Sequence, residues 1–247
     1  MLFLKDKGHN QSFSARPPPA GKEPRPIVER IVEAYIGEYA GGKSEVALNR
    51  ALDLGRAGRK VTLVDLDIVE PCYTLRPIKH LLEERGVCVL AWETKKTVGL
   101  GEAGTVLKAD ARWALRREGD IILDIGYGVE GSRTLSLLEG ARTEKNLRIL
   151  AVINVSRPMT GTVEDIVDHV RGMMPVHGLI NNTHLGDETT PEVVQAGAAV
   201  VDAAARILGL PVVATTAVEQ VARSIGQQDA FGRPVRALTR FMPQAFW

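Results

Sequence analysis

Residues 37–44 read Gly-Glu-Tyr-Ala-Gly-Gly-Lys-Ser, an unbroken match to the pattern G-x-x-x-x-G-K-[ST]. The apolar stretch 31–36 precedes this segment and predicts a strand, and the apolar positions spaced through 45–56 predict a helix after it. Glycines let a chain curl tightly enough for several backbone N–H groups to point at one anion. The sequence therefore predicts a phosphate-binding loop between a strand and a helix, in preference to a glycine-rich turn that matches by chance.

Each position of this loop has an expected role. Lys43 is expected to reach the β- and γ-phosphates of a nucleotide, and the Ser44 hydroxyl is expected to bind Mg²⁺. The predicted nucleotide-binding segment comprises Gly37, Gly41, Gly42, Lys43, Ser44 and Glu45.

Length and composition favour a globular α/β protein. The 247 residues suit one large domain or two small ones, and 45% hydrophobic residues provide for a substantial core. The net charge of +1 gives no general attraction to nucleic acid or to anionic lipid. No apolar run approaches the roughly 18 residues of a membrane span, so stable membrane insertion is not expected. Cys72 and Cys88 form no C-x-x-C pair, and we expect a cytoplasmic protein with free thiols.

Strand and helix patterns alternate along most of the chain. Residues 1–26 are polar and proline-rich and predict an extended arm, whereas 27–247 predict one nucleotide-binding domain. Strands are expected at 30–36, 60–65, 87–92, 120–125, 147–154, 176–181 and 211–215. Helices are expected at 43–57, 74–85, 103–117, 131–140, 160–173, 189–208 and 217–227. The strands are nearly continuous apolar runs, which predicts a doubly wound, mostly parallel sheet with helices on both faces.

Two predicted strands end in carboxylates. Residues 61–67 end in Asp65 and Asp67, and residues 121–128 carry Asp124 followed by a glycine loop. Ligands of doubly wound folds bind at the carboxyl ends of the strands, and Mg²⁺ takes one or two carboxylates together with phosphate oxygens. We therefore expect Ser44, Asp67 and Asp124 to hold the metal ion. Lys43, Asp67 and Asp124 are the expected catalytic residues, with Asp67 orienting the attacking water.

This order of motifs resembles the MinD/ParA/CobQ/nitrogenase-iron-protein group of P-loop NTPases, which belongs to the SIMIBI class. Residues 64–71 resemble switch I of that group, and residues 124–128 resemble switch II. Residues 178–183 resemble the strand whose terminal asparagine reads adenine, with Asn182 at the matching place. Residues 210–213, followed by Val218, resemble the last strand and the loop that closes over the base. The resemblance implies ATP and Mg²⁺ as ligands and a slow ATPase activity.

Glu38 departs from this group. Many members carry a lysine directly after the first glycine of the loop and use it on the phosphates of a dimer partner. A carboxylate there would repel phosphate, so we expect Glu38 to point away or to bind something else. A homodimer would then have to use other surfaces, such as the N-terminal arm.

Several other features have weaker interpretations. Residues 99–104 match G-x-G-x-x-G but lack a preceding strand, and we expect a flexible loop there. The histidines and cysteines show no zinc-like spacing, although His184 is placed to line the nucleotide pocket. Residues 236–247 are expected to pack on the body of the protein or on a dimer mate, because Pro243 interrupts any membrane-binding helix.

Two alternatives to an ATPase remain open. The first is an ATP-dependent ligase or kinase of the dethiobiotin synthetase or cobyrinate amidase type, in which a small molecule accepts the phosphoryl group. The absence of the second lysine favours this alternative. The second is a switch without turnover, in which the nucleotide state controls an unknown protein partner.

Overall fold

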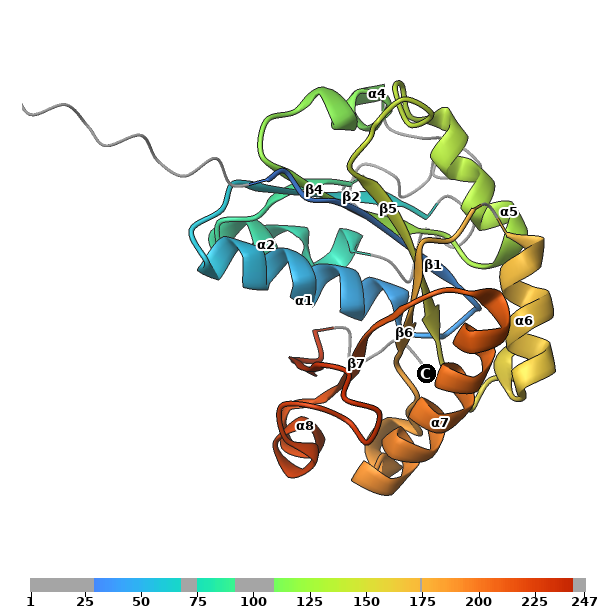
Figure 1. Ribbon diagram of the computed structural model, residues 1–247. Coiled ribbons are helices and arrows are strands. Elements are labelled where there is room, and N and C mark those ends of the chain that lie inside the picture. The colour runs from blue at the N-terminus through green and yellow to red at the C-terminus, as the bar shows by residue number, and fades with distance from the viewer. Residues whose placement is uncertain (1–28, 68–74, 92–108, 174, 242–247) are drawn as a thin grey trace, which may run out of the picture.

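A computed structural model describes residues 29–67, 75–91, 109–173 and 175–241 (Figure 1). Its centre is an eight-stranded sheet in the order β3-β2-β4-β1-β5-β6-β7-β8, with every neighbouring pair parallel. The strands are β1 Val32–Gly37, β2 Val61–Leu66, β3 Cys88–Leu90, β4 Asp120–Ile125, β5 Leu147–Ile153, β6 Gly178–Asn181, β7 Val212–Val218 and β8 Val235–Leu238. The expected arm 1–26, the loop 99–104 and Cys72 lie outside the described residues.

Helices cover both faces of the sheet (Figure 1). They are α1 Lys43–Arg56, α2 Lys79–Glu84, α4 Ala109–Arg112, α5 Gly128–Arg133, α6 Val163–Gly172, α7 Pro191–Leu208 and α8 Glu219–Ile225. Short 3₁₀ turns are η1 Arg76–Ile78, η3 Ala114–Arg116, η4 Thr134–Leu137, η5 Pro158–Thr160 and η6 Gly186–Glu188. One core cluster joins α1 and α2 to one face, and another joins α6 and α7 to the opposite face. The predicted doubly wound parallel fold is confirmed.

The central strands are buried throughout. Every residue of β1, β2 and β4 is buried, because helices lie over both faces of this part of the sheet. Along β1, Ala34 and Ile36 face the core under α6 and α7, whereas Tyr35 faces the core under α1. The continuous apolar runs in the sequence have this physical origin.

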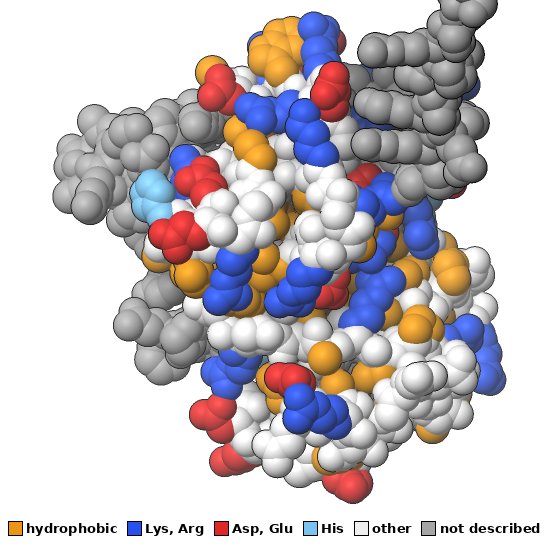
Figure 2. Space-filling view, turned by 90° about the vertical axis from the view of Figure 1, so that its left-hand side faces the viewer, with side chains coloured by type: hydrophobic (Ala, Val, Ile, Leu, Met, Phe, Trp, Pro, Cys, Tyr) orange, Lys and Arg blue, Asp and Glu red, His pale blue; other side chains and the backbone are white. Residues whose placement is uncertain are grey.

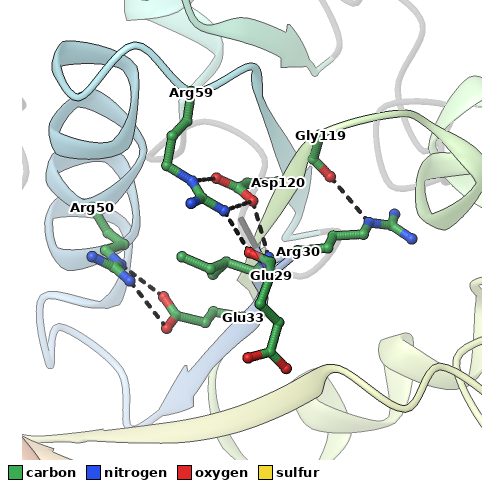
Figure 3. Close-up of polar contacts among 8 residues, drawn as sticks. Glu29, Arg30, Glu33, Arg50, Arg59, Gly119 and Asp120 are labelled. Atoms are coloured by element: carbon green, nitrogen blue, oxygen red, sulfur yellow. Dashed lines mark hydrogen bonds and ion pairs between the residues drawn. The ribbon is translucent and has the colours of Figure 1, made fainter. Parts of the chain in front are cut away.

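Polar contacts stabilise the amino end of the sheet, which lies opposite the carboxyl ends of the strands (Figure 3). Asp120 accepts hydrogen bonds from the Arg59 guanidinium and from the backbone N–H of Ile31. On α1, Arg50 Nε donates to Glu33 Oε2 at 2.9 Å, and the buried Tyr35 hydroxyl donates to the same oxygen at 2.8 Å. The first set of contacts ties the segment between α1 and β2 to β4, and the second ties α1 to β1.

Basic side chains form a band across the side of the molecule on which the amino end of β1 lies (Figure 2). At the amino end of the sheet, two described cations are paired with acids: Arg30 with Glu144 at 3.1 Å and Lys60 with Glu118 at 3.1 Å. Each such pair is neutral as a whole, so the band carries less net positive charge than its number of basic side chains would give.

The strand β8 is absent from the sequence prediction. Residues 235–238 pair in parallel with β7, and only Leu238 among them is buried, so the segment is too short and too polar to show an apolar pattern. The prediction that the C-terminal segment packs on the body is nevertheless confirmed for its described part, 236–241. β7 also extends to Val218, three residues beyond the expected strand end at 215.

Several helices differ from their expected bounds. The described part of the expected helix 103–117 divides into α4 and η3, and α5 begins at Gly128 instead of residue 131. Within the described part of the chain, no helix has both the length and the apolar character required to cross a membrane.

Candidate functional site

The segment 37–44 forms a tight loop between β1 and α1. β1 ends at Gly37, and α1 begins at Lys43. Gly37 has φ 147°, and a Cβ there would lie 2.4 Å from the carbonyl oxygen of Val152. Gly42 has φ 83°, and a Cβ there would lie 2.2 Å from Asn182 Nδ2. Both positions therefore require glycine, for backbone conformation and for space.

Lys43 lies across the loop. Its Nζ donates to the backbone carbonyl of Glu38 at 2.9 Å, and the Gly41 N–H donates to the same oxygen at 3.2 Å. The side chain is buried, so its charge is directed into the loop and not toward solvent. This is the location expected for a cation that neutralises phosphate.

Arg157 supports the outer side of the loop. It follows β5, and its Nε donates to the carbonyl oxygen of Ala40 at 3.2 Å. Ala40 has φ 51°, an uncommon conformation for a residue with a Cβ. The sequence analysis did not identify Arg157, because its 117-residue separation from Ala40 leaves no local signal.

Three carboxylates gather beside the start of α1. Asp65 on β2 and Asp124 on β4 are register partners, and Asp67 donates its backbone N–H to Asp65 Oδ1 at 3.0 Å. Asp124 is fully buried, and among the described residues neither of its carboxylate oxygens has a hydrogen-bond partner. Burial raises the pKa of Asp124 well above its ordinary value, and the charges of Asp65 and Asp67 raise it further. The nearby Ser44 hydroxyl and the charge of Lys43 oppose this rise in pKa.

This arrangement fits a hard divalent cation. The buried carboxylate of Asp124 and the Ser44 hydroxyl are oxygen ligands of the kind that Mg²⁺ binds together with phosphate and water. Asp67 lies at the same edge. Asp65, which the sequence analysis placed at the end of the same strand but did not assign to the metal ion, is a further carboxylate there. No three His, Cys, Asp or Glu side chains of the described segments form a metal site by themselves. A cation here would therefore depend on the hydroxyl and on a bound ligand.

Asn182 connects the loop to β7. Its Nδ2 donates to the Gly41 carbonyl oxygen at 2.8 Å, and its Oδ1 accepts from the Thr216 hydroxyl at 2.7 Å. A side-chain amide has two donor hydrogens and two acceptor lone pairs, so one of each remains for a ligand. Asn182 therefore holds the loop in position and keeps the capacity to contact a base.

A pocket opens beside Gly42. Its lining residues are Gly42, Glu45, Asn182, His184, Gly186, Thr189, Thr216, Ala217, Val218, Leu238 and Arg240. The pocket contains Asn182, His184 and Glu45, which the sequence placed near the nucleotide. It also contains Thr216, which lies beyond the expected end of β7, and Leu238 and Arg240, which lie at and after the unpredicted strand β8.

The electrostatics of the pocket are set by burial and by two arginines. Burial lowers the pKa of His184 to about 4, helped by the charges of Arg157 and Arg240, so its imidazole is neutral near pH 7.

His177 lies outside the pocket lining, with its Nδ1 accepting from the Ile149 N–H at 2.9 Å. Cys88 is an exposed free thiol on β3, away from the pocket lining.

The C-terminal segment forms one wall of this pocket. Asn49 on α1 exchanges two hydrogen bonds of 2.9 Å with the backbone of Thr239. Glu45 Oε1 accepts from the Phe241 N–H at 2.7 Å, and Arg240 pairs with Asp187 at the mouth. The carboxylate of Glu45 is therefore engaged by the protein's own backbone.

Glu38 points toward α6. Its Oε2 lies 3.8 Å from Nε2 of His169, a buried histidine. The Glu38 carboxylate therefore points away from the phosphate loop, as expected, and its neighbour there is His169.

Comparison with models of known protein families finds no match, and comparison with curated proteins finds none. Among solved structures, cell division protein FtsY from Thermotoga maritima matches with TM-score 0.55 and 19% identity, over 89% of this chain and 68% of that one. Signal recognition particle receptor FtsY from Elizabethkingia anophelis, in complex with GDP, matches with TM-score 0.55 and 16% identity, over 79% and 59%. FtsY from Mycoplasma mycoides matches with TM-score 0.53 and 16% identity, over 78% and 62%.

At these identities the likeness shows the fold. It is the fold of the P-loop NTPases. The predicted P-loop NTPase fold is therefore confirmed, whereas the resemblance to the SIMIBI class and to its MinD/ParA group stays a prediction. The chain spans 59% to 68% of the length of these three proteins.

Proposed function

We propose that this protein binds ATP at residues 37–45 and hydrolyses it slowly with Mg²⁺, as a member of the MinD/ParA-like group. The observation that carries the proposal is the buried carboxylate of Asp124, which has no geometric hydrogen-bond partner among the described residues and which feels the charge of Lys43 and the Ser44 hydroxyl. A buried carboxylate without a partner costs free energy in the free protein. Such a cost is reasonable where a cation and phosphate are bound.

The chemistry of the pocket favours adenine over guanine. The Watson–Crick edge of guanine presents N–H donors, and recognition of these donors calls for an acceptor such as a carboxylate. Glu45 is the one acidic residue among the described lining residues, and its Oε1 accepts from the backbone N–H of Phe241, which orients the carboxylate toward the C-terminal segment. The remaining donor and acceptor of Asn182 match the exocyclic amine and N7 of adenine. GDP in one FtsY structure describes that protein and does not decide the base here.

Catalysis would consist of positioning and charge stabilisation, as in other phosphoryl transfers. Lys43 and the loop N–H groups would hold the phosphates, and Asn182 and Arg157 would keep the loop in its conformation. Ser44, Asp67 and Asp124 would hold Mg²⁺, which neutralises charge on the phosphate oxygens when bound. Asp67, the more exposed carboxylate, would orient the attacking water.

Glu38 supports a second candidate, phosphoryl transfer to a small-molecule acceptor. A lysine at this position serves dimeric relatives across their interface, whereas Glu38 offers no cation to a partner's nucleotide. Such a kinase or ligase would hydrolyse ATP very slowly by itself and faster with its acceptor. A nucleotide switch for a protein partner would instead bind tightly with negligible turnover.

The test is phosphate release from Mg²⁺-ATP by wild type and by Asp67→Asn, with Mg²⁺-GTP and metal-free ATP as controls. We expect slow, metal-dependent release that prefers ATP and is at least tenfold slower in the variant. Release at the same rate from both proteins would remove Asp67 from catalysis. The absence of any release with preserved ATP binding would favour the acceptor or switch alternatives.

A further inference from the structure

Glu38 and His169 form a pair that the proposed reaction does not use. Glu38 belongs to the phosphate loop and His169 to the second turn of α6, and their side chains are 18% and 5% exposed. The separation of 3.8 Å between Glu38 Oε2 and His169 Nε2 allows an ion pair only if the imidazole is protonated. Nε2 is buried, and it has no hydrogen-bond partner among the described residues.

The same residue contacts the phosphate-binding lysine. The carbonyl oxygen of Glu38 accepts from Lys43 Nζ at 2.9 Å, so the Glu38 carboxylate lies on the loop that would surround a polyphosphate. A second negative charge beside bound phosphates opposes their binding, and it does so more strongly where water is excluded. A proton on His169 would offset that charge.

Two described charges act on His169. Burial lowers the pKa of the imidazole, Glu38 raises it, and Lys43 lowers it, so that the net pKa is below its ordinary value. The elements α7 and η5 also pack against α6, and within the described residues they add no charge to these two. In the free protein near neutral pH, the imidazole is therefore neutral and the carboxylate is not offset.

We propose that His169 is a positioning residue that takes up a proton when nucleotide phosphates bind beside Lys43, and that the resulting ion pair holds the Glu38 carboxylate away from them. Phosphate charge at Lys43 cancels the influence that disfavours the imidazolium, while Glu38 continues to favour it. The proton comes from solvent and returns when the nucleotide leaves. This inference rests on the proposed nucleotide binding and adds a proton to it.

Proton uptake by His169 makes nucleotide affinity depend on pH in one direction. The bound state holds more protons than the free state, so affinity increases as pH falls through the pKa of His169 in the complex. The gain is complete below the pKa of His169 in the free protein. Each unit by which binding raises this pKa corresponds to about a tenfold increase in affinity at the acid end of the window.

Titration calorimetry of Mg²⁺-ATP binding in Hepes and in Tris, whose heats of ionisation differ, measures the proton uptake directly. We expect uptake near neutral pH to be larger in wild type than in His169→Gln by a sizeable fraction of one proton. His80→Gln removes an exposed histidine of α2 and should match wild type. The titration of ATP itself is common to all three proteins and cancels in the comparison.

Equal proton uptake in wild type and His169→Gln would overturn the inference. If His169→Gln does not fold, Glu38→Gln gives the same test, because the imidazolium loses its partner. Glu38→Gln should lose the uptake and bind Mg²⁺-ATP several-fold more tightly at alkaline pH, and unchanged uptake would contradict the proposal. Absence of binding heat in wild type would instead defeat nucleotide binding itself, so the two failures are distinguishable.

Discussion

Asp65 and Asp124 are register partners on the neighbouring parallel strands β2 and β4, so two carboxylates meet at the carboxyl edge of the sheet beside the phosphate loop. Like charges at this spacing disfavour double ionisation, and burial adds to the cost. The pKa of Asp124 is raised accordingly, burial being the largest cause. The free protein therefore carries an electrostatic cost at the position where a cation would relieve it.

Replacing Asp124 by Asn should stabilise the free protein while abolishing turnover. A raised pKa in the folded state means that wild-type stability falls as pH rises above about 4, whereas the variant lacks this decline. We expect a gain in the free energy of unfolding of about 1–3 kcal/mol at mildly alkaline pH and a smaller gain at acid pH. Urea unfolding across pH measures this, with the half-buried Asp67→Asn as control. A destabilised Asp124→Asn would contradict the account.

Two variants distinguish the structural role of Asn182 from its proposed contact with the base. Asn182→Ala removes both the contact with Gly41 and any contact with the base. Thr216→Val keeps the Asn182 amide and removes the hydroxyl on β7 that donates to it and to the Asn181 carbonyl. We expect wild type to bind ATP several-fold more tightly than GTP. Asn182→Ala should weaken both nucleotides and erode the preference, and Thr216→Val should weaken both while keeping it. Fluorescent-nucleotide titrations measure the affinities of the three proteins for both nucleotides, and equal wild-type affinities would exclude base reading by Asn182.

The amino end of the sheet depends on Arg59. Burial raises the pKa of Asp120, but hydrogen bonds from Arg59 and Ile31 outweigh this effect, and the net pKa lies below its ordinary value. The pair therefore stabilises the fold at neutral pH, and this contribution is lost as pH falls through the lowered pKa. Arg59→Ala should cost about 1.5–3 kcal/mol at pH 7 and less near pH 3. A cost in unfolding free energy that does not change with pH would show that packing, and not charge, explains the contact.

The position of Glu38 bears on whether ATP induces a dimer. With a carboxylate directed at His169, this position cannot hold a partner's nucleotide. Adding ATP to the hydrolysis-blocked Asp67→Asn protein should therefore not convert monomer to dimer in sedimentation velocity. A tight ATP-induced dimer that disappears when Glu38 is replaced would return the protein to the dimeric switches.

Much of the fold could be predicted because local patterns and tertiary packing agree. The loop 37–44 lies between a strand and a helix in the sequence and in the structure, and the buried strands are the continuous apolar runs. The strand β8 could not be predicted, because its four residues gain their structure from pairing with β7 and not from their own pattern.

The site was predictable where one segment supplies it and unpredictable where distant segments meet. Lys43, Ser44 and Asp124 follow from short motifs. Arg157 on the loop and Arg240 at the pocket mouth depend on contacts between segments far apart in the sequence. The direction of the Glu38 side chain also needed the structure, because His169 is brought to it by α6.

The central claim is that Lys43 and the loop 37–44 bind the phosphates of ATP. Calorimetric titration of Mg²⁺-ATP into wild type and Lys43→Ala tests it most directly, with circular dichroism to verify that the variant is folded. We predict binding by wild type and at least a hundredfold loss of affinity in the folded variant, since the variant leaves the phosphate charge without its cation. Unchanged ATP affinity in folded Lys43→Ala would contradict the assignment of the loop.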